Sequence, residues 1–305
     1  MTVLVIVGPT AVGKSALGVA VAQHLATQHI AAEIVSADSM QAYVGMDIGT
    51  ATPTDAERRG VPHHLLDVWP VDYVLTVAEF QQTARAAIDE VLGRGAVPIV
   101  VGGSGLYVSA ILDDLNFPGT DPLVRARYEG ELEAGGPQAL HARLAELDPQ
   151  AAAVILPTNG RRIVRALEVI ELTGEKFIAQ LPEPVEIYPS VRIGLTIARD
   201  EMDARIAQRV HQMFDDGFVD EVRALPGLAA SVTASKALGY TQVLEYLRGE
   251  CTLEDAIDTT IAITRKFARR QQRWFARDTR ITWFDYKDPA LVSRVCELLG
   301  DDTRQ

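Results

Sequence analysis

The chain has little cysteine and no long apolar run. Cys251 and Cys296 are its only cysteines among 305 residues, which argues against a disulfide framework or a cysteine-ligated zinc site. No apolar stretch has the length of a transmembrane helix, and the N-terminal segment lacks the basic region of a secretory signal. We therefore expect a soluble, cytoplasmic protein that does not associate with a membrane.

Basic residues are also scarce. The 29 Lys and Arg residues are outnumbered by 41 Asp and Glu residues, which gives a net charge of −12. This balance argues against a uniformly basic nucleic-acid-binding surface, although a local basic stripe can still bind phosphates. The 48% hydrophobic content is sufficient for one large or two small cores.

The clearest motif lies at the N-terminus. Five apolar residues, Val3–Val7, predict a buried strand, and a helical pattern covers Ala16–Ala26. The segment between them matches the phosphate-binding loop pattern GxxxxGK[ST], and its candidate ligand-binding residues are Gly8, Pro9, Thr10, Ala11, Val12, Gly13, Lys14 and Ser15. Backbone amides and the helix N-terminus would bind phosphate, Lys14 would add a positive charge, and Ser15 would hold Mg²⁺. A turn that binds nothing is the alternative, but the strand–loop–helix context favours a phosphate site.

Asp38 follows the second predicted strand, Ala32–Ser36. Because the carboxyl ends of parallel strands face the ligand crevice, Asp38 should lie near the phosphate loop. Asp also commonly caps turns, so the residues alone leave both interpretations open. The adjacent His63 and His64 cannot both face one metal from a regular element, and structural hydrogen bonds are expected for them.

The strand Val97–Val101 ends in Gly102-Gly-Ser-Gly-Leu-Tyr107, which opens a helix through Leu112. Phosphate-loop NTPases often carry an aspartate after this strand to support Mg²⁺. That aspartate is missing here, which argues against an ordinary ATPase.

Prolines mark the borders of a segment with only helical patterns, over Asp121–Glu133, Gln138–Glu146 and Arg161–Leu172. We therefore predict an α/β fold: a P-loop NTPase-like parallel sheet core flanked by helices, from residues 1–118 and 190–305, with a small all-helical domain inserted at 119–189. Within the insertion, Arg161, Arg162 and Arg165 form a basic patch. By itself this patch is typical of a solvated helix face.

Two helices in the C-terminal half carry arginines with possible roles. Asp200 is expected to cap a helix over Glu201–Phe214, on which Arg205 and Arg209 could reach phosphates or pair with surface acids. On the helix from Leu253 to about Arg277, basic residues segregate opposite the apolar face, among them Lys266, Arg270, Arg273 and Arg277. In so acidic a chain, this stripe favours binding of an anionic polymer over a solvated face.

Taken together, these motifs resemble the tRNA dimethylallyltransferases, also called tRNA isopentenyltransferases. The resemblance runs in order through most of the chain, and its most specific parts are the second and third. The matching stretches are Gly8–Ser15, Asp38-Ser-Met-Gln-Ala-Tyr43, Met46-Asp-Ile-Gly-Thr-Ala51, Val61-Pro-His-His-Leu-Leu-Asp67, Gly102–Tyr107, Arg161-Arg-Ile-Val-Arg-Ala-Leu-Glu168, Arg205–Arg209, Ala237-Leu-Gly-Tyr240 and Arg269-Arg-Gln271. Ser104 stands where many members carry threonine, so a hydroxyl is kept.

The resemblance implies transfer of a dimethylallyl group from dimethylallyl diphosphate to N6 of adenosine 37, next to the anticodon, in tRNAs reading codons that begin with U. The phosphate loop would then bind the diphosphate, with Mg²⁺ as cofactor, rather than ATP. Asp38 would be the base, and Thr10 and Arg209 would act with it in catalysis.

The implied partner is the tRNA anticodon stem-loop, contacted in part by the helical domain, and a monomer is expected. The residues expected to bind tRNA are Asp38, Ser39, Met40, Gln41, Ser104, Arg125, Arg161, Arg162, Ile163, Val164 and Arg165, together with Arg270 and Arg273 from the basic stripe.

Two other functions remain open at this point. A small-molecule kinase of the phosphate-loop type would explain Lys14, Ser15 and Asp38 but not the basic stripe. An RNA-binding module with a relict phosphate loop would explain the stripe but not the intact loop.

Overall fold

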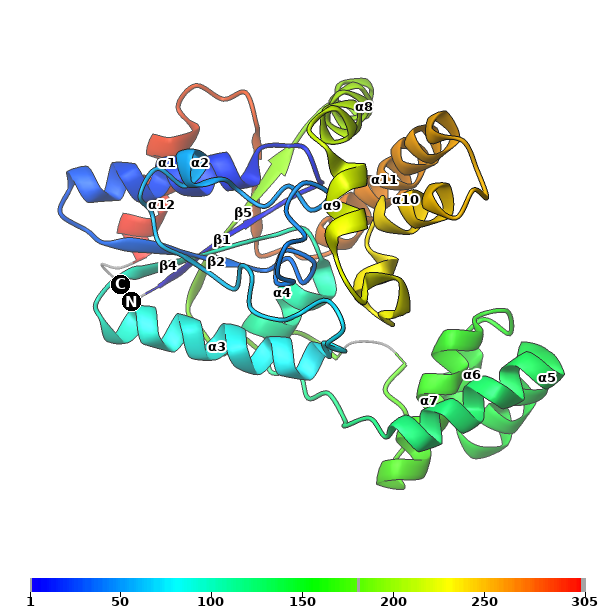
Figure 1. The fold of residues 1–305 in the computed structure, drawn as a ribbon. Coiled ribbons are helices and arrows are strands. Elements are labelled where there is room, and N and C mark those ends of the chain that lie inside the picture. Colours follow the sequence, from blue (N-terminus) through cyan, green and yellow to red (C-terminus); the bar gives the residue numbers. More distant parts are fainter. Residues whose placement is uncertain (1, 180–181, 303–305) are drawn as a thin grey trace. The chain divides into compact units, whose positions relative to one another are not determined.

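A six-stranded parallel sheet forms the centre of the larger of two units. The computed structural model describes residues 2–179 and 182–302 (Figure 1). The strands lie in the order β3-β2-β4-β1-β5-β6, and each neighbouring pair is parallel. They are β1 (Val3–Val7), β2 (Ala32–Ser36), β3 (His63–His64), β4 (Val97–Gly102), β5 (Ser190–Thr196) and β6 (Ile281–Asp285). The predicted parallel α/β core is confirmed.

Helices cover both faces of this sheet, which explains why its central strands are continuously apolar. Leu4 and Ile6 of β1 pack on one side in the same hydrophobic cluster as α1, α8 and α12, whereas Val3, Val5 and Val7 pack on the other with α3, α4, α9 and α10. The helices of this unit are α1 (Lys14–Thr27), α2 (Asp55–Arg58), α3 (Val77–Gly93), α4 (Gly105–Leu112), α8 (Arg199–Asp215), α9 (Phe218–Ala224), α10 (Tyr240–Leu247), α11 (Leu253–Phe275) and α12 (Leu291–Asp302), with short 3₁₀ turns η1 (Leu228–Ala230) and η2 (Ala234–Lys236).

The second unit is helical and has its own core. It spans Asp114–Val185, whereas the sheet unit comprises Met1–Asp113 and Glu186–Gln305. Its helices are α5 (Pro122–Leu147, interrupted at Gly136), α6 (Pro149–Val154) and α7 (Gly160–Thr173). The sequence placed the borders at 119 and 189. The structure places these borders at 114 and 185. Both are slightly earlier than predicted, because the prolines that marked them, Pro118 and Pro189, lie a few residues after the points where the contacts change from one unit to the other.

Three local predictions need correction. Helix α8 begins at Arg199 after Ala198, and Asp200 lies in its first turn rather than capping it. In the first turn its negative charge still interacts favourably with the positive end of the helix dipole. Helix α1 begins at Lys14, two residues earlier than expected, because Gly13 in a left-handed conformation ends the loop. Strands β3 and β6 were not predicted; β3 has only two residues, and in β6 only Ile281 and Phe284 are buried.

Within residues 2–179 and 182–302, no helix has both the length and the apolar character needed to cross a membrane.

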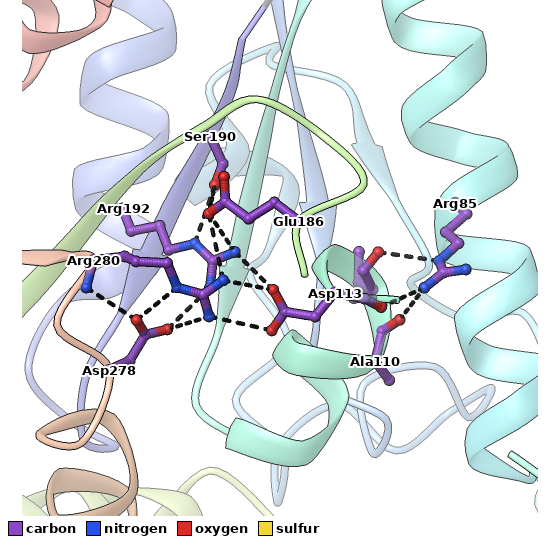
Figure 2. Close-up of polar contacts among 9 residues, drawn as sticks. Arg85, Ala110, Asp113, Glu186, Ser190, Arg192, Asp278 and Arg280 are labelled. Atoms are coloured by element: carbon purple, nitrogen blue, oxygen red, sulfur yellow. Dashed lines mark hydrogen bonds and ion pairs between the residues drawn. The ribbon is translucent and has the colours of Figure 1, made fainter. Parts of the chain in front are cut away.

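A buried ion network joins the two points where the chain leaves and re-enters the sheet unit (Figure 2). Asp113 follows α4, and Glu186 precedes β5. Arg192 of β5 is 4% exposed and contacts Asp113 Oδ1 at 3.1 Å, Glu186 Oε1 at 2.8 Å and Asp278 Oδ2 at 3.0 Å. Arg280 approaches the same Asp113 oxygen at 2.7 Å and Asp278 Oδ1 at 2.8 Å.

These contacts fix segments that lie far apart in the sequence. Burial alone would raise the pKa of Asp278, but hydrogen bonds from Arg280 and the charge of Arg192 outweigh it and lower that pKa. Arg85 of α3 adds hydrogen bonds to the carbonyls of Ala110 and Asp113 at the end of α4, both at 2.8 Å. The base of the insertion is therefore held by charge pairing.

We predict that Asp113→Asn destabilises the sheet unit by about 3 kcal/mol, because the variant removes the most deeply buried carboxylate that Arg192 and Arg280 share and leaves the buried Arg192 guanidinium with Glu186 and Asp278. Urea unfolding followed by tryptophan fluorescence would measure this, since Trp69, Trp274 and Trp283 all lie in the sheet unit.

The control is Glu250→Gln, which removes a partner from an exposed pair with Arg248. That change should alter stability by less than about 1 kcal/mol. Equal effects of the two substitutions would show that the buried network contributes no more than a surface pair.

Candidate active site

The phosphate-binding loop lies between β1 and α1, as the motif predicted. Gly8 and Gly13 have φ values of +147° and +103°, which side chains with a Cβ rarely adopt. A Cβ at Gly8 would also lie 3.1 Å from the carbonyl oxygen of Leu195 on the neighbouring strand β5. The two glycines therefore allow the loop to turn tightly at the carboxyl end of the sheet.

Lys14 is half-buried beside this loop. Its Nζ donates a hydrogen bond to the carbonyl oxygen of Pro9 at 2.8 Å. Burial, followed by the positive charge of Arg209, lowers the pKa of Lys14 to about 8, and the charge of Asp38 partly opposes this shift. Two mutually repelling cations inside the protein would gain from an anion between them, as expected of a phosphate site.

Two arginines of α8 contact the loop in different ways. Arg205 Nε donates to the carbonyl oxygen of Ala11 at 2.8 Å, so it holds loop backbone rather than a surface acid. Arg209 donates to Thr10 Oγ1 at 3.4 Å and to the carbonyl oxygen of Thr50 at 3.5 Å. Burial lowers the pKa of Arg209, with the charges of Asp38 and Glu57 opposing. Of these two arginines, Arg209 is therefore the one whose side chain lines the site.

Asp38 both caps a turn and lines the site, so the two interpretations of its role are compatible. Its Oδ1 accepts a hydrogen bond from the backbone N–H of Met40 at 3.0 Å. Its own N–H donates to Ser36 Oγ at 3.3 Å. These contacts orient the carboxylate, and the same residue lies on the wall of a cavity with Thr10 and Arg209.

That cavity has a volume of about 390 Å³ and lies entirely within the sheet unit. Its lining is partly polar and partly apolar, and α8 supplies residues of both kinds. Its polar lining includes Thr10, Asp38, Ser39, Ser104, Arg209 and Arg270. Its apolar lining includes Tyr107, Ile206, Val210, Met213, Phe218 and Leu238. The site can therefore place phosphates and a carboxylate beside a small apolar group.

Helix α11 closes against the glycine-rich turn after β4. Gln271 Oε1 accepts a hydrogen bond from the Thr10 N–H at 2.8 Å. A Cβ at Gly103 would lie 2.3 Å from Gln271 Nε2, and one at Gly105 would lie 2.0 Å from the Trp274 ring. The glycines thus admit protein side chains, and Trp274 packs on this turn.

The basic stripe on α11 is segregated as predicted, because Lys266, Arg270, Arg273 and Arg277 are all exposed. The flanking arginines are engaged with α8 instead. Arg269 Nη2 pairs with Asp203 Oδ2 at 2.8 Å, and Arg265 donates to the Asp203 carbonyl oxygen.

In the helical unit, several residues expected to bind RNA also have contacts within the fold. The side chains of Ile163 and Val164 are 0% and 2% exposed in the unit's core, and contact of these two positions with RNA stays a prediction. Helical periodicity turns these two positions inward while Arg161 stays exposed.

The remaining arginines of that patch have partners. Arg125 and Arg165 each contact Glu168 Oε2 at 2.8 Å. Burial would raise the pKa of Glu168, but hydrogen bonds from Arg125, Thr120 and Arg165 lower it to about 2. Arg162 donates to the carbonyl oxygen of Ala179. Any contact of these side chains with RNA would use their remaining N–H groups.

The histidines have structural roles, as expected. His64 Nε2 lies 2.6 Å from Glu33 Oε2, and His63 Nδ1 lies 2.8 Å from the carbonyl oxygen of Val61. In the described part of the chain, no group of three or more His, Cys, Asp or Glu side chains could hold a metal ion.

The chain's contribution to a magnesium site would accordingly be small. Ser15 is exposed in the first turn of α1, where its hydroxyl can be a ligand. Mg²⁺ commonly takes its other ligands from bound phosphates and water. The residues present fit a Mg²⁺ ion that binds together with a phosphate ligand.

Sequence reasoning missed Gln271 as a partner of the loop and the cavity-lining role of the apolar residues of α8. Periodicity places Ile206, Val210 and Met213 on one apolar face of α8, and it cannot distinguish a face that packs in the core from one that lines a cavity. The glycines at 103 and 105 were the available signal that side chains approach this turn closely.

Comparisons with known proteins agree with the geometry. A family model described as IPP transferase matches residues 41–278. A tRNA dimethylallyltransferase from Thermobifida fusca is 61% identical over 302 residues, covering 97% of this chain and 95% of that protein. The crystal structure of a tRNA isopentenylpyrophosphate transferase from Bacillus halodurans is similar at a TM-score of 0.72 and 40% identity, covering 99% of this chain and 96% of that one. A eukaryotic dimethylallyltransferase acting on tRNA is similar at a TM-score of 0.78 and 25% identity, covering 98% and 77%.

The lowered pKa of Lys14 predicts a pH dependence of phosphate binding. Below pH about 8 the Lys14 ammonium is charged, and above that pH it loses its proton. A lysine with the ordinary pKa of 10.5 would stay charged over this range. Affinity for inorganic diphosphate, measured by calorimetry, should therefore decline as pH rises through about 8. In Lys14→Arg, whose guanidinium stays charged, the decline should be absent. Parallel pH profiles for the two proteins would contradict this role.

Proposed function

The chain belongs to the tRNA dimethylallyltransferase family, and we propose that it transfers the dimethylallyl group of dimethylallyl diphosphate to N6 of adenosine 37, next to the anticodon, in tRNAs reading codons that begin with U. The products are N6-(dimethylallyl)adenosine and diphosphate. The observation that carries the proposal is the single cavity in which Thr10 and Arg209 at the phosphate loop lie with Asp38 and an apolar wall. The matching relative and the matching family model are both named as transferases of the isoprenyl type, and this does not favour the kinase alternative.

The phosphate loop would bind the diphosphate of the donor. Its backbone N–H groups, the Lys14 ammonium and the Arg209 guanidinium can neutralise the charge that grows as the allylic C–O bond breaks. Thr10 would contact the same group, since its hydroxyl already accepts a hydrogen bond from Arg209. Ser15 would hold Mg²⁺, which when bound supplies further positive charge to the leaving diphosphate.

Asp38 would act as the base. The lone pair of N6 forms the new N–C bond to the first carbon of the dimethylallyl group, and the electrons of the breaking C–O bond leave with diphosphate. The amine must also lose one proton, and Asp38 is the carboxylate on the cavity wall placed to take it. The apolar lining from α8 and α9 would limit access of water, which would otherwise hydrolyse an allylic cation.

tRNA would approach through its anticodon stem-loop. The target adenine must leave the base stack to reach the cavity, which costs little in a single-stranded loop. Ser39, Met40 and Ser104 at the cavity would contact the base or its neighbours, and Arg270 with the exposed Arg273 would bind phosphates. Gln41, Arg125 and the Arg161–Arg165 segment are proposed contacts on the family resemblance. The proposal includes a cytoplasmic monomer as the working form.

The direct test supplies the full chain with unmodified tRNA and either labelled dimethylallyl diphosphate or γ-labelled ATP. Label in tRNA from the first donor alone supports the proposal. Label from ATP in a small product would support a kinase, and binding of tRNA without any transfer would support an RNA-binding module.

We predict that Asp38→Asn lowers the chemical step by about 10²–10⁴-fold, because asparagine keeps the size of the side chain but cannot accept the proton. Single-turnover rates and separate equilibrium binding of each substrate would measure this, and both substrates should bind within a few-fold of wild type. A near wild-type rate would show that the proton goes elsewhere. Loss of donor binding would instead place Asp38 in the phosphate or metal site.

We also predict that replacing Arg270 and Arg273 with alanine weakens tRNA binding and reduces its salt dependence, because two phosphate contacts are lost. Donor affinity should change little. Arg223→Ala serves as a control, since that exposed side chain pairs with Asp220 away from the stripe. If tRNA affinity at several salt concentrations matches that of the control, the stripe is a solvated helix face.

A further inference from the structure

Two of the stretches that carry the family resemblance, Met46–Ala51 and Ala237–Tyr240, have no assigned role in the chemistry described above. In the structure they meet at a single carboxylate. Glu221 of α9 accepts hydrogen bonds from three consecutive backbone N–H groups, those of Asp47 at 2.9 Å, Ile48 at 2.6 Å and Gly49 at 3.2 Å. The hydroxyl of Tyr240 donates to the same carboxylate at 2.6 Å.

This carboxylate is satisfied by dipoles rather than by a cation. Among residues 2–179 and 182–302, no Lys, Arg or His side chain forms an ion pair with Glu221, whereas three N–H groups and one O–H group donate to it. Consecutive N–H groups that point inward form an anion-binding concavity, which here is filled by a side chain of the protein itself. Burial, followed by the charge of Glu221, raises the pKa of Tyr240, so its hydroxyl remains a donor.

The aromatic residues around Glu221 fix the same loop from another side. Phe218 and Tyr240 pack edge to face, with ring centroids 4.9 Å apart. A Cβ at Gly49 would lie 2.3 Å from Phe218 Cε2 and 2.5 Å from Tyr240 Cε2. Only glycine fits at this position, and the loop therefore rests on the ring pair while Glu221 holds its backbone.

The next residue of the loop connects this anchor to the active site. The carbonyl oxygen of Thr50 accepts a hydrogen bond from Arg209 Nη2 at 3.5 Å and from Gln41 Nε2 at 3.3 Å. Gly49 and Thr50 also line the cavity. Gln41 in turn accepts from Ser36 Oγ at 2.9 Å, and that hydroxyl also accepts from the N–H of Asp38.

We infer that Glu221, assisted by Tyr240, is a positioning residue for the transfer reaction: it holds the backbone of residues 47–49 so that the Thr50 carbonyl orients the Arg209 guanidinium toward the diphosphate. This inference rests on the proposed function. Glu221 touches neither substrate, and its effect on the reaction passes through Arg209.

A double-mutant cycle tests this route. Glu221→Gln removes the charge and replaces one acceptor oxygen by an NH₂ group facing an N–H. In single turnover at limiting donor, Glu221→Gln should lower the rate by about 10–100-fold. This is the usual loss when a residue that orients a catalytic side chain is changed and that side chain is slightly displaced. In the Arg209→Ala background the same substitution should lower the rate by less than about threefold, because its effect is already lost.

Two further measurements separate positioning from general stability. tRNA affinity without donor should stay at the wild-type value in Glu221→Gln. Tyr240→Phe keeps the ring against Gly49 but removes one donor, and should lower the rate by roughly two- to tenfold even if Glu221→Gln does not fold. The control is Asp220→Asn, the adjacent acidic residue of α9, whose side chain is 80% exposed and pairs with Arg223; it should behave like wild type.

Equal fold losses for Glu221→Gln in the wild-type and Arg209→Ala backgrounds would overturn the inference, as would wild-type rates for both Glu221→Gln and Tyr240→Phe. Failure of the proposed function looks different: the wild-type chain itself would then transfer no label from dimethylallyl diphosphate to tRNA.

Discussion

The constraint on which the rest of the structure depends is the parallel direction of the sheet strands. It brings the carboxyl ends of β1, β2 and β4 to one edge, and the chain continues from them into the phosphate loop, the Asp38 turn and the Gly102–Ser104 turn. The three segments lie close together in space although they are far apart in the sequence, because each follows the carboxyl end of a strand. Residues of the Gly8–Ser15 loop and the Asp38 carboxylate therefore line one cavity, because the strands that precede them share one direction.

The sheet alone does not set the geometry of that cavity. Helices from the second half of the chain supply the long-range contacts: Arg205 and Arg209 of α8 reach the phosphate loop, Gln271 of α11 holds the Thr10 N–H, and Glu221 of α9 holds the 47–49 backbone. Each of these contacts joins a side chain to backbone or to a hydroxyl, which positions a loop without adding bulk at the site. The Asp113–Arg192–Arg280 network performs a similar task at the base of the insertion.

The local patterns of the sequence were sufficient for the parallel core, the phosphate loop and the segregated basic stripe of α11. Strong periodicity or a complete motif marks each of these. The sequence did not reveal Glu221 or Gln271, because a polar residue on an amphipathic helix looks the same whether it faces water or a loop more than 170 residues away. The family stretch that includes Ile163 and Val164 also did not reveal that its helix turns these two side chains into the core of the helical unit. Strands β3 and β6 were not predicted, because strands this short show too little hydrophobic periodicity.

The central claim is that this cavity joins a dimethylallyl group to the N6 amine of one adenine while the phosphate loop retains the diphosphate. The most direct measurement is mass spectrometry of nuclease fragments from tRNA incubated with the full chain and dimethylallyl diphosphate. The account predicts one added dimethylallyl group, located on the adenosine next to the anticodon and absent from tRNAs whose anticodons do not read codons beginning with U. Addition at other nucleosides, or unmodified tRNA after complete incubation, would contradict it.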